Sequence, residues 1–141
     1  MSAKNLIFGS SISGPLLSQL GLGALRVITG LSIAFGHGLA KLPPSSQFVK
    51  AVAALGFPLP EFFAWAAGMS EFVGGLLLAA GLMTRPAAAA VAFTLGVAAF
   101  GHHASDPFKA RELALLYCAI SLLFACAGSG RFGLDRIVNR L

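Results

Sequence analysis

Long apolar stretches, separated by short polar or proline-containing segments, divide most of the chain into four parts. About 20 apolar residues are needed for a helix to cross a typical bilayer, and the first two stretches reach that length. The third and fourth are shorter, because charged residues lie near their ends. The pattern therefore predicts four membrane-spanning helices, over residues 20–41, 61–84, 86–103 and 107–127.

Proline residues mark the predicted ends of these helices. Pro43 follows the first apolar stretch and cannot continue a helix. Pro86 suits the first position of the third helix, and Asp106 followed by Pro107 is a helix start signal. The local sequence therefore predicts the order of the spans and the positions of the turns between them.

The segments outside the spans are predicted to lie at the membrane surface. Residues 45–56 carry several apolar side chains around Lys50 but are too few to cross a bilayer, so they predict a short interfacial helix. Residues 1–19 are expected to form a cytoplasmic or interfacial segment, and residues 129–141 a basic tail. The predicted fold class is thus all-α: a four-helix transmembrane bundle with one interfacial helix.

The composition supports a membrane protein and argues against a soluble one. Of the 141 residues, 57% are hydrophobic and only 11% are charged, whereas a soluble domain has about 25% charged residues. The net charge of +5 comes from basic residues near the span ends, which is typical of proteins that face anionic lipid. No basic stripe with interleaved aromatic residues is present, so nucleic acid is not an expected partner.

The basic residues also favour one orientation. Four spans place both termini on the same side of the membrane, and the more basic side usually faces the cytoplasm. The side with the termini would carry Lys4, Arg26, Arg85, Arg131, Arg136 and Arg140, and the opposite side Lys41, Lys50, Lys109 and Arg111. We therefore expect both termini in the cytoplasm.

Small residues recur every four positions and predict the packing faces of three spans, since helices in lipid approach closely through such residues. The rows are Gly30, Ala34 and Gly38 in the first span, Ala67, Gly75 and Ala79 in the second with Glu71 at the intervening position, and Ala88, Ala92 and Gly96 in the third.

Ionisable residues inside the spans are the main functional signal. Glu71 falls near the middle of the membrane on a packing face, and His37, His103 and Glu112 fall in the outer part. Arg26 lies on the His37 side of the first helix, near the cytoplasmic edge. A charge at the bilayer centre costs about 2.5–3.5 kcal/mol on insertion scales. The sequence therefore predicts that these groups converge between the bundle centre and its outer mouth.

Three interpretations of this cluster stay open. It is a site for a ligand, a proton or a quinone, or a structural clamp in which Glu71 bonds to His37, Tyr117 or a backbone group. The third is a metal site, because histidine and carboxylate are suitable ligand types, although no short-spaced metal motif supports it. Cys118 and Cys126 lie about 12 Å apart along one helix, too far for a disulfide within it.

A larger pattern in the second span resembles the DoxX family of small membrane proteins. The residues that carry it, in the order E-x-x-G-G-x-x-L-x-x-G-x-x-T-R, are Glu71, Gly74, Gly75, Leu78, Gly81, Thr84 and Arg85. The likeness extends to Arg26, Gly36, Gly38, Lys41 and Glu112, to the turn at residues 56–58 and to the ending at residues 128–135. It implies a four-helix protein of the bacterial inner membrane, related to subunits of a membrane thiosulfate:quinone oxidoreductase and to proteins of redox and sulfur stress.

The leading hypothesis is accordingly a membrane subunit of a redox or oxidative-stress system, with quinone as the candidate ligand. Glu71 or a histidine would supply the hydrogen bond and the proton that a quinone carbonyl needs. No recognisable motif for flavin, haem or an iron–sulfur cluster is present, so electron transfer would require a partner protein. A homo-oligomer stays open. The alternatives are a small-solute or proton-coupled carrier and a scaffold without chemistry of its own.

Overall fold

The structure, a computed structural model, describes residues 7–140, and all the regular elements in this range are helical. Lys4 lies outside the described residues. The first long helix is continuous through α2 (Leu16–Ile33), a π-helical turn η1 (Ala34–Gly38) and a 3-10 turn η2 (Leu39–Lys41). The other elements are α3 (Ser46–Ala54), α4 (Pro60–Ala80), α5 (Thr84–Val97) with the π-helical turn η3 (Ala98–His102), α6 (Phe108–Ala127) and α7 (Asp135–Arg140).

Four helices in the described part of the chain are long and apolar enough to cross a membrane: Leu16–Lys41, Pro60–Ala80, Thr84–His102 and Phe108–Ala127. Their outer surfaces carry large apolar side chains, among them Leu17, Phe62 and Phe100, which are 81%, 64% and 67% exposed. Such a surface suits a lipid environment, since water disfavours contiguous apolar area. The predicted all-α bundle of four spans is confirmed.

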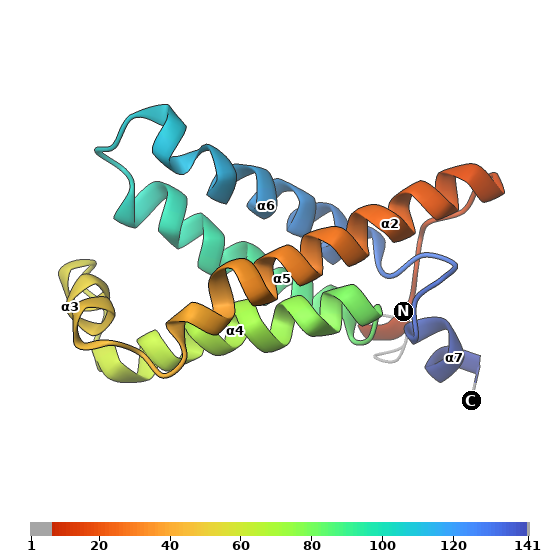
Figure 1. The fold of residues 1–141 in the computed structure, drawn as a ribbon. Helices are drawn as coiled ribbons and strands as arrows, with labels where there is room; N and C mark the ends of the chain where they lie inside the picture. Colours follow the sequence, from red (N-terminus) through yellow and green to blue (C-terminus); the bar gives the residue numbers. More distant parts are fainter. Residues whose placement is uncertain (1–6, 141) are drawn as a thin grey trace.

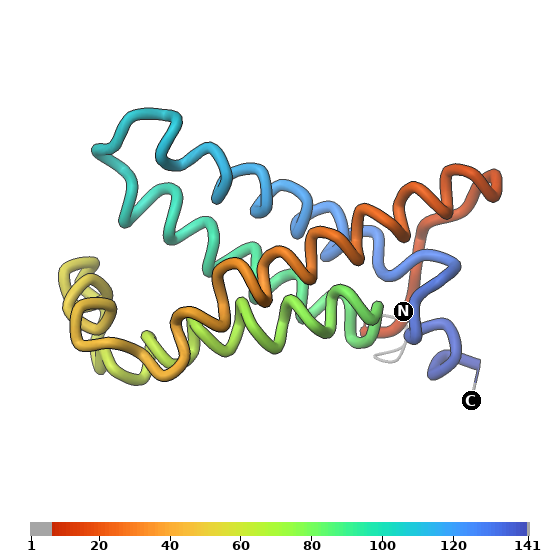
Figure 2. The backbone as a smooth tube through the Cα atoms, in the orientation of Figure 1, coloured from red at the N-terminus to blue at the C-terminus, as the bar shows by residue number. Residues whose placement is uncertain are grey.

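The bundle is built around α4, which packs against α2 on one side and α5 on the other, while α5 forms a hairpin with α6. Figure 1 shows α3 lying at one end of the bundle, near the connection between α5 and α6, and both chain ends at the opposite end. The same path can be followed along the tube in Figure 2. The two ends of the molecule therefore differ in what they can bind.

Glycines bring α2 and α4 into close contact along the packing faces that their rows of small residues predict. A Cβ atom added at Gly30 would lie 2.5 Å from the carbonyl oxygen of Gly75, and one added at Gly75 would lie 2.8 Å from that of Gly30. Farther along, a Cβ at Gly38 would collide with the backbone of Glu71 and Phe72. The first helix therefore lies directly on α4 along this seam.

Two charged residues hold the tight turn between α4 and α5. Arg26 donates from Nη1 to the carbonyl oxygens of Leu78 and Ala79, both at 2.6 Å, and so satisfies the C-terminal end of α4. The fully buried Asp135 accepts from the backbone N–H groups of Met83 at 2.6 Å and Thr84 at 3.0 Å, at the start of α5. Both contacts come from parts of the chain that are distant in sequence.

The helix boundaries differ from the expected ones at this turn. The second span ends at Ala80 rather than at residue 84, because Gly81 adopts the left-handed conformation (φ 69°) that closes a helix. The third begins at Thr84 rather than at residue 86, because Asp135 caps its first N–H groups. The first span also begins earlier, at Leu16.

Candidate functional site

A cavity of about 550 Å³ lies between α3, α4 and α5 and the end of the first helix. This volume is within the usual range for small-molecule sites, about 300–1,000 Å³. Most of its wall is apolar or aromatic, from Phe48, Ala51, Val52, Leu55, Phe57, Phe63, Ala66, Ala67, Ala90, Phe93, Val97 and Ala98. Its polar residues are His37, Lys41, Ser70, Glu71, Thr94, His102 and His103.

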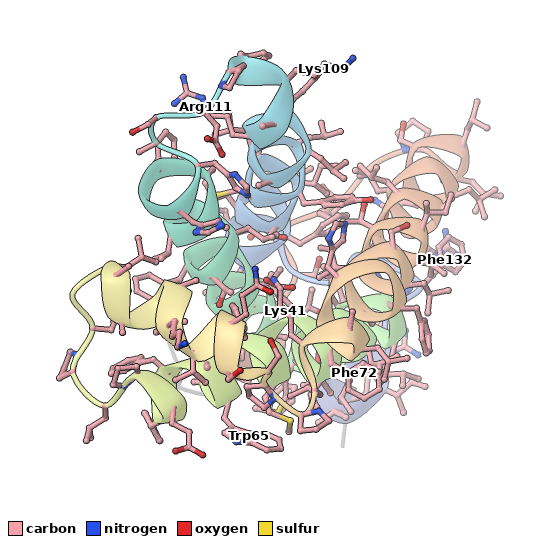
Figure 3. All side chains as sticks on the ribbon, turned by 60° about the vertical axis from the view of Figure 1, so that its left-hand side comes forward. Lys41, Trp65, Phe72, Lys109, Arg111 and Phe132 are labelled. Atoms are coloured by element: carbon pink, nitrogen blue, oxygen red, sulfur yellow. The ribbon has the colours of Figure 1, made fainter. Side chains whose placement is uncertain are left out.

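An ion pair between Lys41 and Glu71 is the main polar feature of this cavity. Lys41 Nζ lies 2.5 Å from Oε1 and 2.7 Å from Oε2 of Glu71. The Glu71 side chain is fully buried, whereas 29% of the Lys41 side chain is exposed. Figure 3 shows Lys41 in the space between the helices, with Lys109 and Arg111 at the edge of the molecule. Lys41 is therefore the more accessible of the two partners.

This geometry gives the two residues different chemical capacities. An ammonium group has three N–H donors, and the two Glu71 oxygens engage at most two of them. The remaining donor of Lys41 is available to a molecule in the cavity. Glu71 neutralises the ammonium charge in a setting where an unpaired charge would be costly.

The cavity histidines at positions 37 and 102 lie in the two π-helical turns. His37 belongs to η1, and its ring packs edge-on against Tyr117 of α6 with the centroids 5.7 Å apart. His102 ends η3 and packs edge-on against His103 at 4.7 Å. Since π-helical turns are rare and frequently occur at functional sites, their presence in both histidine-bearing helices supports a ligand site here.

His103 closes the connection between α5 and α6 at the mouth of the cavity. Its Nδ1 lies 2.7 Å from Oδ2 of Asp106, and its carbonyl oxygen accepts from the Asp106 N–H at 3.1 Å. The side-chain contact leaves Nε2 as the ring atom that is free to face other groups. Deeper in the cavity, Thr94 Oγ1 donates to Ser70 Oγ at 3.1 Å and joins α5 to α4.

The structure brings together three of the five residues that the sequence singled out. Glu71, His37 and His103 line the cavity. Glu112 does not line it, and its side chain is exposed on α6. Arg26 is buried near the opposite end of α4, where it binds the backbone of the α4–α5 turn.

Lys41 and His102 were missed by the sequence reasoning, for different physical reasons. Lys41 was placed at a span end, yet it follows His37 by four residues and so shares its helical face, a signal that was present in the sequence. His102 falls off the small-residue row of an ideal α-helix, but the π-helical turn η3 inserts an extra residue and changes the helical phase. The π-helical turn η3 had no local sequence signal.

No group of three or more His, Cys, Asp or Glu side chains that could hold a metal ion is found within residues 7–140. Cys118 and Cys126 are both free thiols. The polar chemistry of the cavity is therefore that of one ion pair, three imidazoles and two hydroxyls.

Comparison with known proteins assigns the chain to a family. The family model DoxX matches residues 21–104, a range that includes every polar residue of the cavity. A protein of Bacillus subtilis (strain 168) named "Putative oxidoreductase CatD" is 34% identical over 121 residues, which cover 85% of this chain and 88% of that protein. No solved structure matches. The chain is a multi-pass membrane protein and belongs to the DoxX family.

Proposed function

We propose that this protein is a membrane subunit of a redox or oxidative-stress system, and that its cavity holds a quinone head group. The observation that carries the proposal is an ammonium group, paired with a buried carboxylate, in a cavity whose other walls are largely apolar. The printed name of the Bacillus subtilis relative describes that protein as an oxidoreductase and supports the same direction.

A quinone matches the cavity in both shape and polarity. Its flat apolar ring suits the aromatic walls formed by Phe48, Phe63 and Phe93. Its carbonyl oxygens are hydrogen-bond acceptors, and Lys41 keeps a donor available to them. The lipid phase in which quinones dissolve surrounds the helices that form the cavity.

The residues of the cavity would then have distinct roles. Lys41 binds a carbonyl oxygen through Nζ, and Glu71 acts as a positioning residue that holds the ammonium in place. His37, which packs on Tyr117, offers a second donor from the first helix. His102 and His103, at the mouth, connect the cavity with the aqueous boundary and can hold or pass a proton at a ring nitrogen.

The proposal also includes a partner and an orientation. Because the sequence carries no recognisable motif for an electron-carrying cofactor, the electrons come from a partner protein. With both termini in the cytoplasm of a bacterial inner membrane, as the basic residues favour, the cavity lies toward the outer face. A partner that reduces or oxidises the quinone would dock at that face.

The first test is a binding titration of a short-chain quinone with the purified protein in neutral detergent. Lys41→Met removes the ammonium donor, and we expect at least about tenfold weaker binding, since hydrogen bonds to charged groups contribute roughly 1.5–3 kcal/mol. Glu112→Gln is the matched control, because this carboxylate lies outside the cavity. Equal affinity in wild type, Lys41→Met and Glu112→Gln would contradict the quinone site.

A further variant, Glu71→Gln, separates the two alternative functions. Mass spectrometry of small molecules that co-purify with wild type, and their loss in Glu71→Gln, would identify the ligand directly. Solute flux into liposomes that depends on Glu71, without quinone binding, would indicate a carrier. If Glu71→Gln lowers only the thermal stability and changes neither binding nor flux, the ion pair is structural and the protein is a scaffold.

A further inference from the structure

A second cavity, of about 540 Å³, lies at the end of the bundle opposite α3. It is formed between the segment that precedes α2 and the tail that follows α6. Arg131, Arg136 and Arg140 line it, and the polar side chains of Ser13, Gln19 and Asn139 contribute to the same wall. It is thus separate from the quinone cavity in both position and charge.

Hydrogen bonds between the two ends of the chain fix the walls of this cavity. The N–H of Ser11 donates to the carbonyl oxygen of Ala127 at 2.8 Å, and the N–H of Gly130 donates to Ser10 Oγ at 3.0 Å. Gln19, which is only 4% exposed, accepts from the N–H of Arg131 through Oε1 at 3.1 Å. The basic tail is therefore held in place at Gly130 and Arg131 and is not a loose extension.

The arginines of this cavity have no acidic partner within residues 7–140. The two side-chain ion pairs of the described residues are Lys41 with Glu71 and His103 with Asp106, both elsewhere. Asp135, the nearest acid in the sequence, is buried and turned toward the N–H groups of Met83 and Thr84. The cavity consequently has a strong excess of positive charge.

We infer that this cavity is an anion site that takes the phosphate group of a ligand. Guanidinium groups bind phosphate in a planar, two-point geometry, and basic pockets at the ends of membrane helices are suited to lipid head groups. Leu16, Leu17 and Leu20, whose side chains are exposed, lie in the first turns of α2 beside this cavity. The cavity therefore opens where the apolar surface ends. A phospholipid head group and free phosphate share the required chemistry.

The test is native mass spectrometry of the full chain in neutral detergent, titrated in separate arms with phosphatidylglycerol, phosphatidylcholine and inorganic phosphate. Arg136→Gln/Arg140→Gln removes two cavity arginines. Lys50→Gln/Lys109→Gln removes two exposed cations that do not line this cavity and serves as the control of equal charge. We expect saturable phosphatidylglycerol binding to weaken about twenty-five-fold in the arginine variant, at roughly fivefold for each cation, and to persist in the lysine variant.

The arms also identify the source of the phosphate. Saturable binding of inorganic phosphate with the same dependence on the arginines, without tight lipid binding, assigns the site to a free anion. Binding that is not saturable, or that weakens equally in the two double variants, would overturn the site and leave only general attraction to anionic lipid. The single variant Arg140→Gln, expected to bind about fivefold more weakly, provides the same comparison if the double variant does not fold.

Discussion

At the residue scale, the pairing of Lys41 with Glu71 changes the role that is assigned to the intramembrane carboxylate. The sequence indicated Glu71 or a histidine as the group that meets the ligand, because an ionisable residue inside a membrane is functional by default. In the structure Glu71 is fully enclosed and its two oxygens face Lys41. The accessible polar group is the lysine, whose terminal nitrogen reaches back into the bundle from the end of its helix.

We predict a strong energetic coupling between these two residues. Lys41→Met should destabilise the fold by about 3–5 kcal/mol, because it leaves the fully buried Glu71 carboxylate without its partner. Glu71→Leu should cost less, because the Lys41 ammonium that it leaves unpaired is partly exposed. The double variant should cost clearly less than the sum of the two. The free energy of unfolding in detergent, measured as a double-mutant cycle, gives the coupling.

Exposed residues on α6 supply the control for this cycle. Lys109→Met and Glu112→Leu remove the same charged groups outside the cavity and should each change stability by less than about 1 kcal/mol. Additive effects at Lys41 and Glu71 would mean that the ion pair does not form in the folded protein.

At the element scale, α2 and α4 form the structural centre of the protein. The row of small residues in the first span predicted the packing face of this helix, where Gly30, Ala34 and Gly38 are all buried, but not its partner α4. The signal was strong because only a glycine or alanine row allows two backbones to touch. The contacts of Arg26 and Asp135, by contrast, join residues far apart in the chain and had no periodic signal.

Gly38→Ala should destabilise the bundle by about 1–3 kcal/mol, the usual cost of forcing extra volume into a packed interface. The new methyl group would meet the backbone of Glu71 and Phe72, which cannot move aside as a flexible side chain could. Gly36→Ala is the control, because a Cβ at Gly36 meets no atom within 4 Å. Thermal unfolding of both variants tests the contact, and equal midpoints would argue against it.

Asp135→Ala should lower stability by about 0.5–2 kcal/mol, the typical cost of losing a helix N-cap. The substitution removes both acceptors for the first N–H groups of α5. Asp135→Asn keeps one side-chain oxygen and should lower stability by less than Asp135→Ala does. The ranking of wild type, Asn and Ala in chemical unfolding checks the role of this residue, and a variant series with no ranking would contradict it.

At the scale of the whole molecule, the two ends of the bundle carry different chemistry. One end holds the cavity with the ion pair and the histidines, and the other holds the arginine-lined cavity and both termini. Hydropathy alone was sufficient to predict four spans in this order. It was not sufficient to predict that α3 would cover a cavity, since that depends on how its apolar side meets α4.

The orientation in the membrane can be tested with single cysteines. In a background without Cys118 and Cys126, we expect Ser105→Cys, at the α5–α6 connection, to react with an impermeant maleimide on intact spheroplasts. Ser13→Cys, near the termini, should react only after lysis. Both side chains are exposed in the folded protein, so the reverse labelling pattern would place the termini outside.

The contacts of Arg26 and Lys41 have a consequence for biogenesis. Both cations belong to the first helix, and both find their partners on α4, which is synthesised later. On leaving the ribosome the first helix therefore carries two charges that its own sequence cannot satisfy, each costly to leave alone in lipid. We expect this helix to remain with the insertion machinery until α4 arrives, so that the two enter the bilayer as one unit.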